Sequence, residues 1–334
     1  MNTEHVDIGL ARYSDWAFTS SVVVLVVALL LLAVELAYSR GRKVESRELV
    51  GAAAAATSNV SATVGVDSST PGVVAAEPKR PLDERVGKAG LALVYVGIGL
   101  LLVCIVLRGL ATARVPWGNM YEFINLTCFS GLIAAAVVLR RQQYRALWVF
   151  VLVPVLILLT VSGRWLYTNA APVMPALQSY WLPIHVSVVS IGSGVFLVAG
   201  VASILFLLKM SPLGRSDADG ALARIVQRLP DAQTLDRIAY RTTIFAFPVF
   251  GFGVIFGAIW AEEAWGRYWG WDPKETVSFI AWVVYAAYLH ARSTAGWRDK
   301  KAAWINVVGF VAMVFNLFFI NLVTVGLHSY AGVG

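Results

Sequence analysis

Charged side chains are scarce in this sequence. Only 14% of its 334 residues are Asp, Glu, Lys or Arg, whereas 58% are hydrophobic. A soluble globular domain carries about 25% charged residues. The shortage excludes an ordinary soluble enzyme and predicts a membrane protein instead. The net charge of +7 is compatible with nucleic-acid binding, but the basic residues are sorted by membrane side, so we expect no nucleic-acid partner.

Cysteine is also rare, and familiar catalytic motifs are missing. Cys104 and Cys128 lie inside apolar runs and form no C-x-x-C pair, which favours packed small side chains over redox or metal chemistry. The lack of C-x-x-C-H excludes covalent attachment of c-type haem to this chain. We find no G-x-x-x-x-G-K, no G-x-G-x-x-G after a strand and no convincing Ser/His/Asp arrangement. The sequence therefore gives no support for nucleotide binding or a serine-hydrolase triad.

Long apolar runs make up most of what is present. A helix needs about 20 apolar residues to cross the hydrocarbon core of a bilayer. Eight runs approach or exceed that length, and the third, fourth and seventh are the shortest. They predict an all-α, polytopic transmembrane bundle with spans at about 17–38, 89–110, 122–139, 146–162, 185–208, 242–260, 276–291 and 303–324.

Lys and Arg are distributed unevenly among the connecting segments. Segments 39–88, 140–145, 209–241 and 292–301 contain 21 of the 27. Because these residues collect on the cytoplasmic side, both termini are predicted to lie on the outer side. We expect an outer tail and first span at 1–38, a cytoplasmic, largely disordered linker at 39–88 and a seven-span core at 89–334. The stretch L-A-R-I-V-Q-R-L in the core predicts a short amphipathic helix on the inner leaflet.

Tryptophan is concentrated in one predicted outer loop, residues 260–275. Four of the 12 Trp occur there within 12 residues, at Trp260, Trp265, Trp269 and Trp271. Such an aromatic surface suits a large planar ligand, although Trp also collects in aromatic belts at membrane interfaces. Asp272 begins D-P-K-E, which is typical of a helix N-cap with a capping box, so we expect it to have a structural role first.

Only four histidines occur, and three lie at the ends of predicted spans. His185 and His328 are predicted on the outer side beside the Trp-rich segment, where two neutral imidazoles could ligate a haem iron from opposite faces. His290 follows Asp272 by 18 residues, or about 27 Å of helix, and is therefore predicted at the inner face. His5 lies in the polar tail and is taken as incidental. Each histidine could instead be an interfacial hydrogen-bonding group near a helix end.

Several motifs occur in a recognisable order. W-G-N-M-Y-E-F stands at 117–123, L-D-R-I-A-Y-R at 235–241 and F-P at 247–248. They are followed by W-A-E-E-A-W-G-R-Y-W-G-W-D-P-K-E-T, by A-Y-L-H-A-R and by N-L-V-T-V-G-L-H-S-Y-A at 321–331. From about residue 88 onward the chain resembles the tryptophan-rich "WWD" haem-handling membrane proteins, and most closely the CcsA/ResC-type subunit of the System II cytochrome c synthase.

The resemblance implies a function in cytochrome c biogenesis, with haem b as the transported and presented ligand. It implies that His185 and His328 are external axial ligands and that His290 belongs to an inner haem site. Trp260, Trp265, Trp269, Trp271 and Asp272 would form the haem platform. Implied partners are a ResB/CcsB-like membrane subunit, an apocytochrome c with C-x-x-C-H, and a thiol-reducing protein. The synthase activity would belong to the complex, and a bacterial plasma membrane is favoured over a thylakoid membrane.

Three other functions remain open from the sequence. A haem exporter or chaperone of the CcmC/CcmF kind would deliver haem without synthase activity. A b-type haem electron-transfer subunit would need His pairs on facing helices inside the bundle. A transporter with an aromatic belt would bind no haem. Arg164, Arg267 and Lys274 are predicted near the outer loop, where they could pair with haem propionates or mark a solvated rim.

Overall fold

The computed structural model of the chain describes residues 6–58, 82–172, 178–321, 323–324 and 326–328. Throughout these residues the regular structure is helical and no strand occurs, which confirms the predicted all-α class. The helices, in chain order, are α1 (Ile8–Ser58), α2 (Leu82–Thr112), α3 (Met120–Val138), α4 (Leu147–Trp165), α5 (Trp181–Lys209), α6 (Ala221–Arg228), α7 (Ala232–Trp265), α8 (Pro273–Ser293) and α9 (Lys300–Phe315), which continues as the π-helical turn η4 (Asn316–Ile320).

Seven of these helices are long and apolar enough to cross a membrane. They are α1 over Ile8–Tyr38, α2, α3, α4, α5, α7 and α9 with η4. The predicted seventh span forms α8, which has 21 residues but a less apolar composition and falls outside that group. A polytopic helical bundle is therefore confirmed, and the membrane crossing of α8 and the outer placement of both termini stay predictions.

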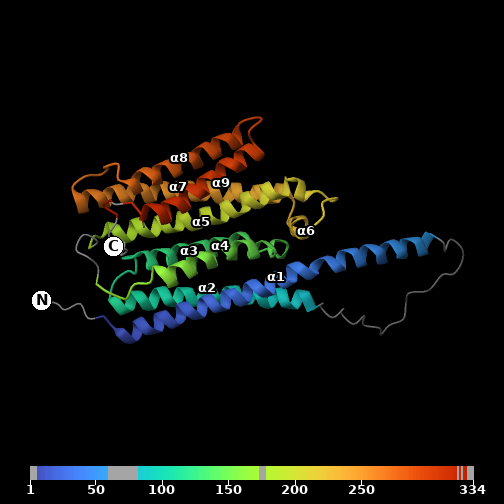
Figure 1. Cartoon of the computed structure of the whole chain (residues 1–334), viewed down its shortest axis with the longest axis horizontal. Coiled ribbons are helices and arrows are strands. Elements are labelled where there is room, and N and C mark those ends of the chain that lie inside the picture. Colours follow the sequence, from blue (N-terminus) through green and yellow to red (C-terminus); the bar gives the residue numbers. More distant parts are fainter. Residues whose placement is uncertain (1–5, 59–81, 173–177, 322, 325, 329–334) are drawn as a thin grey trace, which may run out of the picture.

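The helices run side by side in a layered bundle (Figure 1). α1 and α2 pair at one side, α3 and α4 follow, and α7, α8 and α9 form the other side. α5 lies between these groups and packs against α3, α7 and α9. The start of α3, the end of α7, the start of α8 and η4 lie at the same end of the bundle, so segments distant in sequence meet there.

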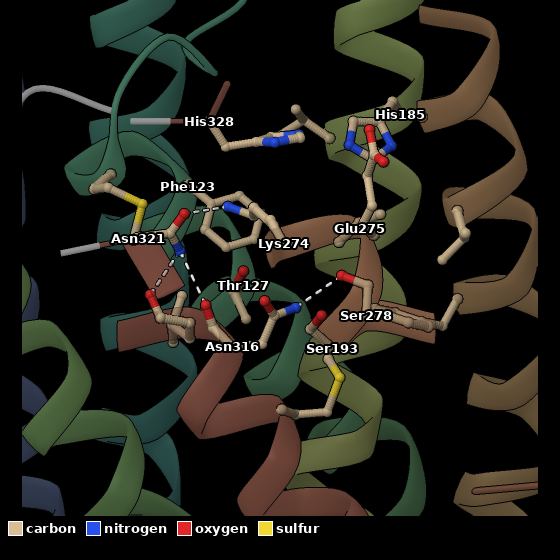
Figure 2. A pocket seen from close by; sticks show the side chains of 18 of the residues that line it. Phe123, Thr127, His185, Ser193, Lys274, Glu275, Ser278, Asn316, Asn321 and His328 are labelled. Atoms are coloured by element: carbon tan, nitrogen blue, oxygen red, sulfur yellow. Dashed lines mark hydrogen bonds between the residues drawn. The ribbon is translucent and has the colours of Figure 1, made fainter. Parts of the chain in front are cut away.

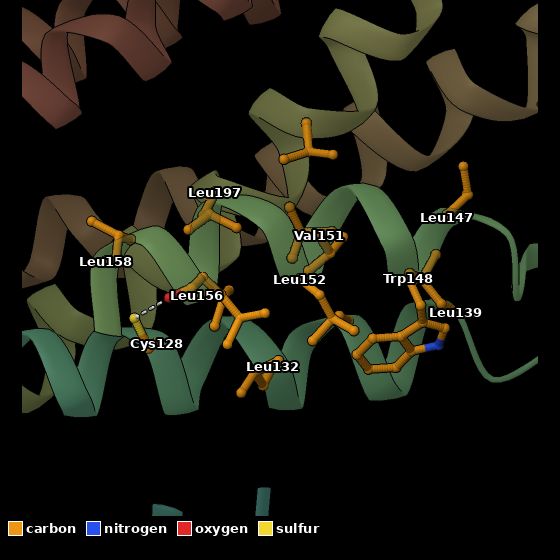
Figure 3. Close-up of a cluster of buried hydrophobic side chains, with 14 of the residues drawn as sticks. Cys128, Leu132, Leu139, Leu147, Trp148, Val151, Leu152, Leu156, Leu158 and Leu197 are labelled. Atoms are coloured by element: carbon orange, nitrogen blue, oxygen red, sulfur yellow. Dashed lines mark hydrogen bonds between the residues drawn. The ribbon is translucent and has the colours of Figure 1, made fainter. Parts of the chain in front are cut away.

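Close packing of small and branched side chains holds α3, α4 and α5 together (Figure 3). Leu132 of α3, Leu152 of α4 and Leu197 of α5 are buried in this core. A Cβ on Gly194 would lie 2.5 Å from the backbone nitrogen of Gly131, so the crossing of α3 and α5 requires glycine. Cys104 and Cys128 are both buried and unpaired, as expected for packed small residues.

The predicted linker is narrower than the sequence suggested. α1 continues as helix from the first span to Ser58, and α2 already begins at Leu82. Helix therefore replaces both ends of the 39–88 segment, and the remaining residues 59–81 lie outside the described part of the chain. The amphipathic helix predicted within 209–241 forms α6, whose Ala223 and Val226 are buried. Its position on a membrane surface stays a prediction.

Candidate functional site

A cavity of about 370 Å³ opens among α3, α4, α5, α7, α8, α9 and η4. His185 and His328 lie at one end of it, as Figure 2 shows, and their rings approach from α5 and from the segment after η4. Most of the remaining wall is apolar, with Phe123, Val189 and Phe250 as examples. An apolar cavity with few polar groups at defined positions is the usual form of a site for a large ligand.

His185 is oriented by the backbone of α7. Its Nδ1 lies 2.8 Å from the carbonyl oxygen of Gly253. A carbonyl can only accept, so Nδ1 carries the proton and Nε2 keeps a free lone pair. A Cβ on Gly257 would lie 2.6 Å from Cε1 of this ring, so the imidazole can lie against α7 only because residue 257 is glycine. His185 is thus held as the tautomer that can ligate iron through Nε2.

His328 is oriented by a carboxylate. Asp272 Oδ2 lies 2.8 Å from His328 Nδ1, and Asp272 Oδ1 accepts a 2.8 Å hydrogen bond from the backbone N–H of Leu327. The same side chain caps α8 by accepting from the N–H of Lys274, and Glu275 completes the expected capping box. Asp272 therefore has two structural functions: it caps α8, and it orients the His328 ring through Nδ1. Carboxylate–histidine pairs of this kind are typical of metal-ligating histidines.

Electrostatics around this pair favour a neutral imidazole. Burial lowers the pKa of His328, although the hydrogen bond with Asp272 partly opposes that effect. Burial acts to raise the pKa of Asp272, but the hydrogen bonds from His328 and from the backbone of Leu327 outweigh it, so that pKa is lowered overall. Asp272 is thus a carboxylate and His328 a neutral donor of the Nδ1 proton, which is the ligating form.

Trp260 connects the two histidines. Its ring centroid lies 6.1 Å from that of His185, nearly parallel to it, and 6.0 Å from that of His328. Trp260 is only 1% exposed, and Trp265 packs edge-on against both Trp260 and His328 at 4.7 and 5.1 Å. Together, these two indole rings pack against both histidines, at the same end of the cavity.

The predicted Trp-rich loop is divided differently in the structure. α7 continues through Trp265 and ends at Gly266, which has a left-handed conformation with φ of 69°. Trp260 and Trp265 are therefore helical, and the loop itself contains Trp269 and Trp271. Trp269 lines the cavity, whereas Trp271 is 69% exposed. The four rings do not form one flat platform.

Trp271 has an unusual backbone conformation. Its φ is +56°, which is disfavoured for a large side chain. Glu275 Oε2 accepts hydrogen bonds from the backbone N–H groups on both sides of it, from Gly270 at 2.9 Å and Asp272 at 3.1 Å. This carboxylate stabilises the turn and keeps the Trp271 indole outside the bundle.

His290 lies apart from these residues. It is in the last turn of α8, its side chain is exposed, and it does not line the cavity. The described contacts at this position involve its backbone carbonyl, which accepts hydrogen bonds from Ser293 and Thr294. The structure brings together His185 and His328 and leaves His290 at the opposite end of α8, as the sequence predicted from helix length.

A buried ion-pair network beside the cavity was missed by the sequence reasoning. Arg108 is 1% exposed and donates from Nε to Glu122 Oε1 at 3.1 Å, while Arg114 Nη1 lies 3.1 Å from Glu122 Oε2. Glu122 also accepts a 2.8 Å hydrogen bond from the backbone N–H of Gly118. The network holds the 117–119 turn, which lines the cavity. The sequence did contain an indication of this network, because its charged residues stand at the ends of apolar runs, where an unpaired charge is costly.

Comparison with known proteins places the chain in a family. The model of the family described as "Cytochrome C assembly protein" matches residues 117–328, which include the cavity, His185, His328 and His290. The chain belongs to this family. It is 35% identical to the cytochrome c biogenesis protein CcsA of Guillardia theta over 71% of this chain and 85% of that protein. It is 34% identical to CcsA of Microcystis aeruginosa and 35% identical to CcsA of Thermosynechococcus vestitus, each over 77% of this chain and 90% of the relative. The predicted resemblance to the CcsA type is confirmed.

Proposed function

We propose that this cytochrome c assembly protein binds haem b between His185 and His328 and presents it to an apocytochrome c. A role in cytochrome c biogenesis follows from its family and from its CcsA-type relatives. The observation that carries the finer proposal is the matched orientation of the two imidazoles. Each imidazole is fixed through Nδ1, and both rings lie at the same end of one apolar cavity.

Haem fits this donor set better than a bare metal ion. In the described part of the chain, no group of three or more His, Cys, Asp or Glu is arranged to hold a metal. Two imidazoles are enough for haem, because the porphyrin supplies the four equatorial nitrogens and the protein adds two axial ligands. Trp260 and Trp265 support the histidines, and Trp269 lines the cavity where the porphyrin would lie.

The reaction we propose is the addition of two cysteine thiols to the two haem vinyl groups. Each sulfur bonds to the vinyl carbon next to the ring and the thiol proton goes to the terminal carbon, so no oxidant or reductant is consumed in the step. The histidine of the C-x-x-C-H segment then replaces one of the two protein ligands. The chain contributes positioning and control of the iron ligands, and thiol and vinyl supply the reactivity.

The partners follow from this reaction and from the position of His290. An apocytochrome c is the acceptor, and a thiol-reducing protein keeps its cysteines reduced. We assign the inner haem site to exposed His290 together with a ResB/CcsB-like membrane subunit. The chain is a multi-pass membrane protein by its seven apolar helices. A bacterial plasma membrane is proposed for it, and the relatives from cyanobacteria make a thylakoid membrane equally compatible.

The test uses the full chain co-expressed with its ResB/CcsB-like partner and purified in detergent. The reduced protein is expected to show the sharp α and β bands of low-spin haem. His185→Ala and His328→Ala should each weaken them strongly, and His5→Ala is the matched control. Absence of haem from the wild type would overturn the proposal.

A second assay separates presentation from attachment. An apocytochrome c is added, and covalent attachment is followed by the absorption shift that accompanies vinyl saturation. A C-x-x-C-H to S-x-x-S-H variant should give no shift. Bound haem that is transferred without thioether formation would favour an exporter or chaperone instead.

A further inference from the structure

The cavity beside the two histidines has one basic and one acidic side chain in its wall, and they lie on opposite sides. Among its described lining residues, Lys274 is the one Lys or Arg, and Glu275 is the one Asp or Glu. Both begin α8, but they point in different directions in Figure 2. Lys274 reaches toward Phe123 and Asn321, and Glu275 lies toward His185. The other basic residues predicted near the outer loop, Arg164 and Arg267, do not line the cavity.

Lys274 is held in place with donor capacity to spare. Its Nζ donates to Asn321 Oδ1 and lies 5.7 Å from the ring centroid of Phe123. Asn321 is itself fixed by hydrogen bonds from its amide to the carbonyls of Asn316 and Leu317. An ammonium group has three N–H bonds, so two remain for a ligand beyond the one given to Asn321.

Thr127 supplies a second donor on the same side. It lies one helical turn after Phe123 on α3, is 4% exposed and lines the cavity. Its Oγ1 is buried and has no hydrogen-bond partner within the described structure. A buried hydroxyl without a partner is costly, so such a group calls for an explanation. Figure 2 shows Thr127 below Lys274, facing the same part of the cavity.

The chemistry of the proposed cargo matches this arrangement. This inference rests on the proposed function, in which two thiols add to the haem vinyl groups. The thiols can reach those groups only if the vinyl edge of the porphyrin faces outward. The two propionates lie on the opposite edge and must then enter the cavity. We propose that Lys274 and Thr127 form a receptor for a haem propionate, which selects the porphyrin edge that enters the cavity. Glu275, across the cavity, repels a propionate from its own side, so the propionate enters on the side of Lys274 and Thr127.

The experiment compares two ligands that differ only at the carboxylates. The full chain, purified in detergent without haem, is titrated with iron protoporphyrin IX and with its dimethyl ester, and low-spin bands report binding. The wild type should bind the free acid at least about tenfold more tightly, because a charge-assisted hydrogen bond is lost with the ester. Lys274→Met should abolish that preference, and Thr127→Val should reduce it. Arg164→Gln, which changes a basic residue outside the cavity, should keep it.

The preference between the two haems separates ligand recognition from a structural role. If Lys274 only fixed Asn321 and the segment before His328, Lys274→Met would weaken both haems equally and overturn the proposal. Equal binding of both haems by the wild type would overturn it as well, while leaving the haem-binding function intact. Binding of neither haem by the wild type would overturn the proposed function and this receptor together.

Discussion

The two ends of α8 differ in how completely they define a site. At its start, Asp272 caps the helix and orients His328, which lines the same cavity as His185. At its end, His290 is exposed on the bundle surface. A ligand site needs side chains whose rotamers are fixed by their neighbours. The comparison teaches that the start of α8 belongs to a group of oriented side chains around a cavity, whereas its end presents a single exposed histidine at the bundle surface.

Removing His328 from the cavity should have the largest effect on haem binding. His328→Ala leaves one axial position without a protein ligand, so haem affinity should fall by roughly 100-fold or more. Mutating a residue that only hydrogen-bonds to a metal ligand typically costs 10–100-fold, and losing the ligand itself should cost more. Added imidazole should restore the low-spin bands, because it fills the vacated position. Spectra of the detergent-purified chain with and without imidazole provide the measurement. Unchanged bands without imidazole would refute ligation by His328.

Asp272→Asn should weaken the site by about tenfold without uncapping α8. Asn and Asp are comparable N-caps, so the helix start is kept. The carboxylate accepts from Lys274 and His328 through Oδ2 and from Leu327 through Oδ1, whereas an amide has one oxygen and its NH2 group cannot accept, so one of these bonds is lost. Haem titration measures the loss, and thermal unfolding of the haem-free chain provides the control for capping. Equal haem affinity for both proteins would mean that Asp272 only caps the helix.

Gly257→Ala tests the orientation of His185. The new Cβ would lie 2.6 Å from Cε1 and 2.8 Å from Nδ1, so the ring must turn and its bond to Gly253 must lengthen. A loss of haem affinity of about tenfold is expected, together with broadened low-spin bands. Gly99→Ala is the matched control, since a Cβ there meets nothing within 4 Å in α2. If both variants bind haem like the wild type, α7 does not orient His185.

His290→Ala should have the smallest effect on the purified chain. The side chain is exposed and far from the cavity, so haem affinity at the outer histidines and thermal stability should stay within measurement error. In cells that also express the ResB/CcsB-like partner, the amount of haem recovered with the complex should fall. Loss of the low-spin bands from this variant alone would place the captured haem at the inner end instead.

Several features could be predicted from the sequence because they depend on local chemistry. The apolar runs predicted the eight long helices, and D-P-K-E predicted the cap at Asp272 together with its capping box. The separation of Asp272 from His290 followed from the rise per residue of a helix. The extent of α7 was less predictable. Its last turns contain Trp260, Trp265 and Gly266, and the hydropathy of that stretch resembles that of a loop.

The pairing of distant residues could not be read from spacing. His328 and Asp272 are 56 residues apart, and His185 and Gly253 are 68 apart. Their contacts require α8 to pack against α9 and α5 to pack against α7. Which helices pack together depends on side-chain shape along whole faces, which short motifs do not contain. For the same reason, the ion pair of Arg108 with Glu122 could not be predicted from the sequence.

By itself, the sequence determined that this chain forms apolar helices, where their apolar cores lie, and that Asp272 caps the start of α8. Hydrophobic periodicity and helix capping act over a few residues, so a single sequence contains them. Only the tertiary structure decided that His185 and His328 share one cavity, that Asp272 orients the second, and that Lys274 faces inward. Those outcomes depend on close packing between helices, where a missing Cβ at Gly257 decides whether a histidine fits.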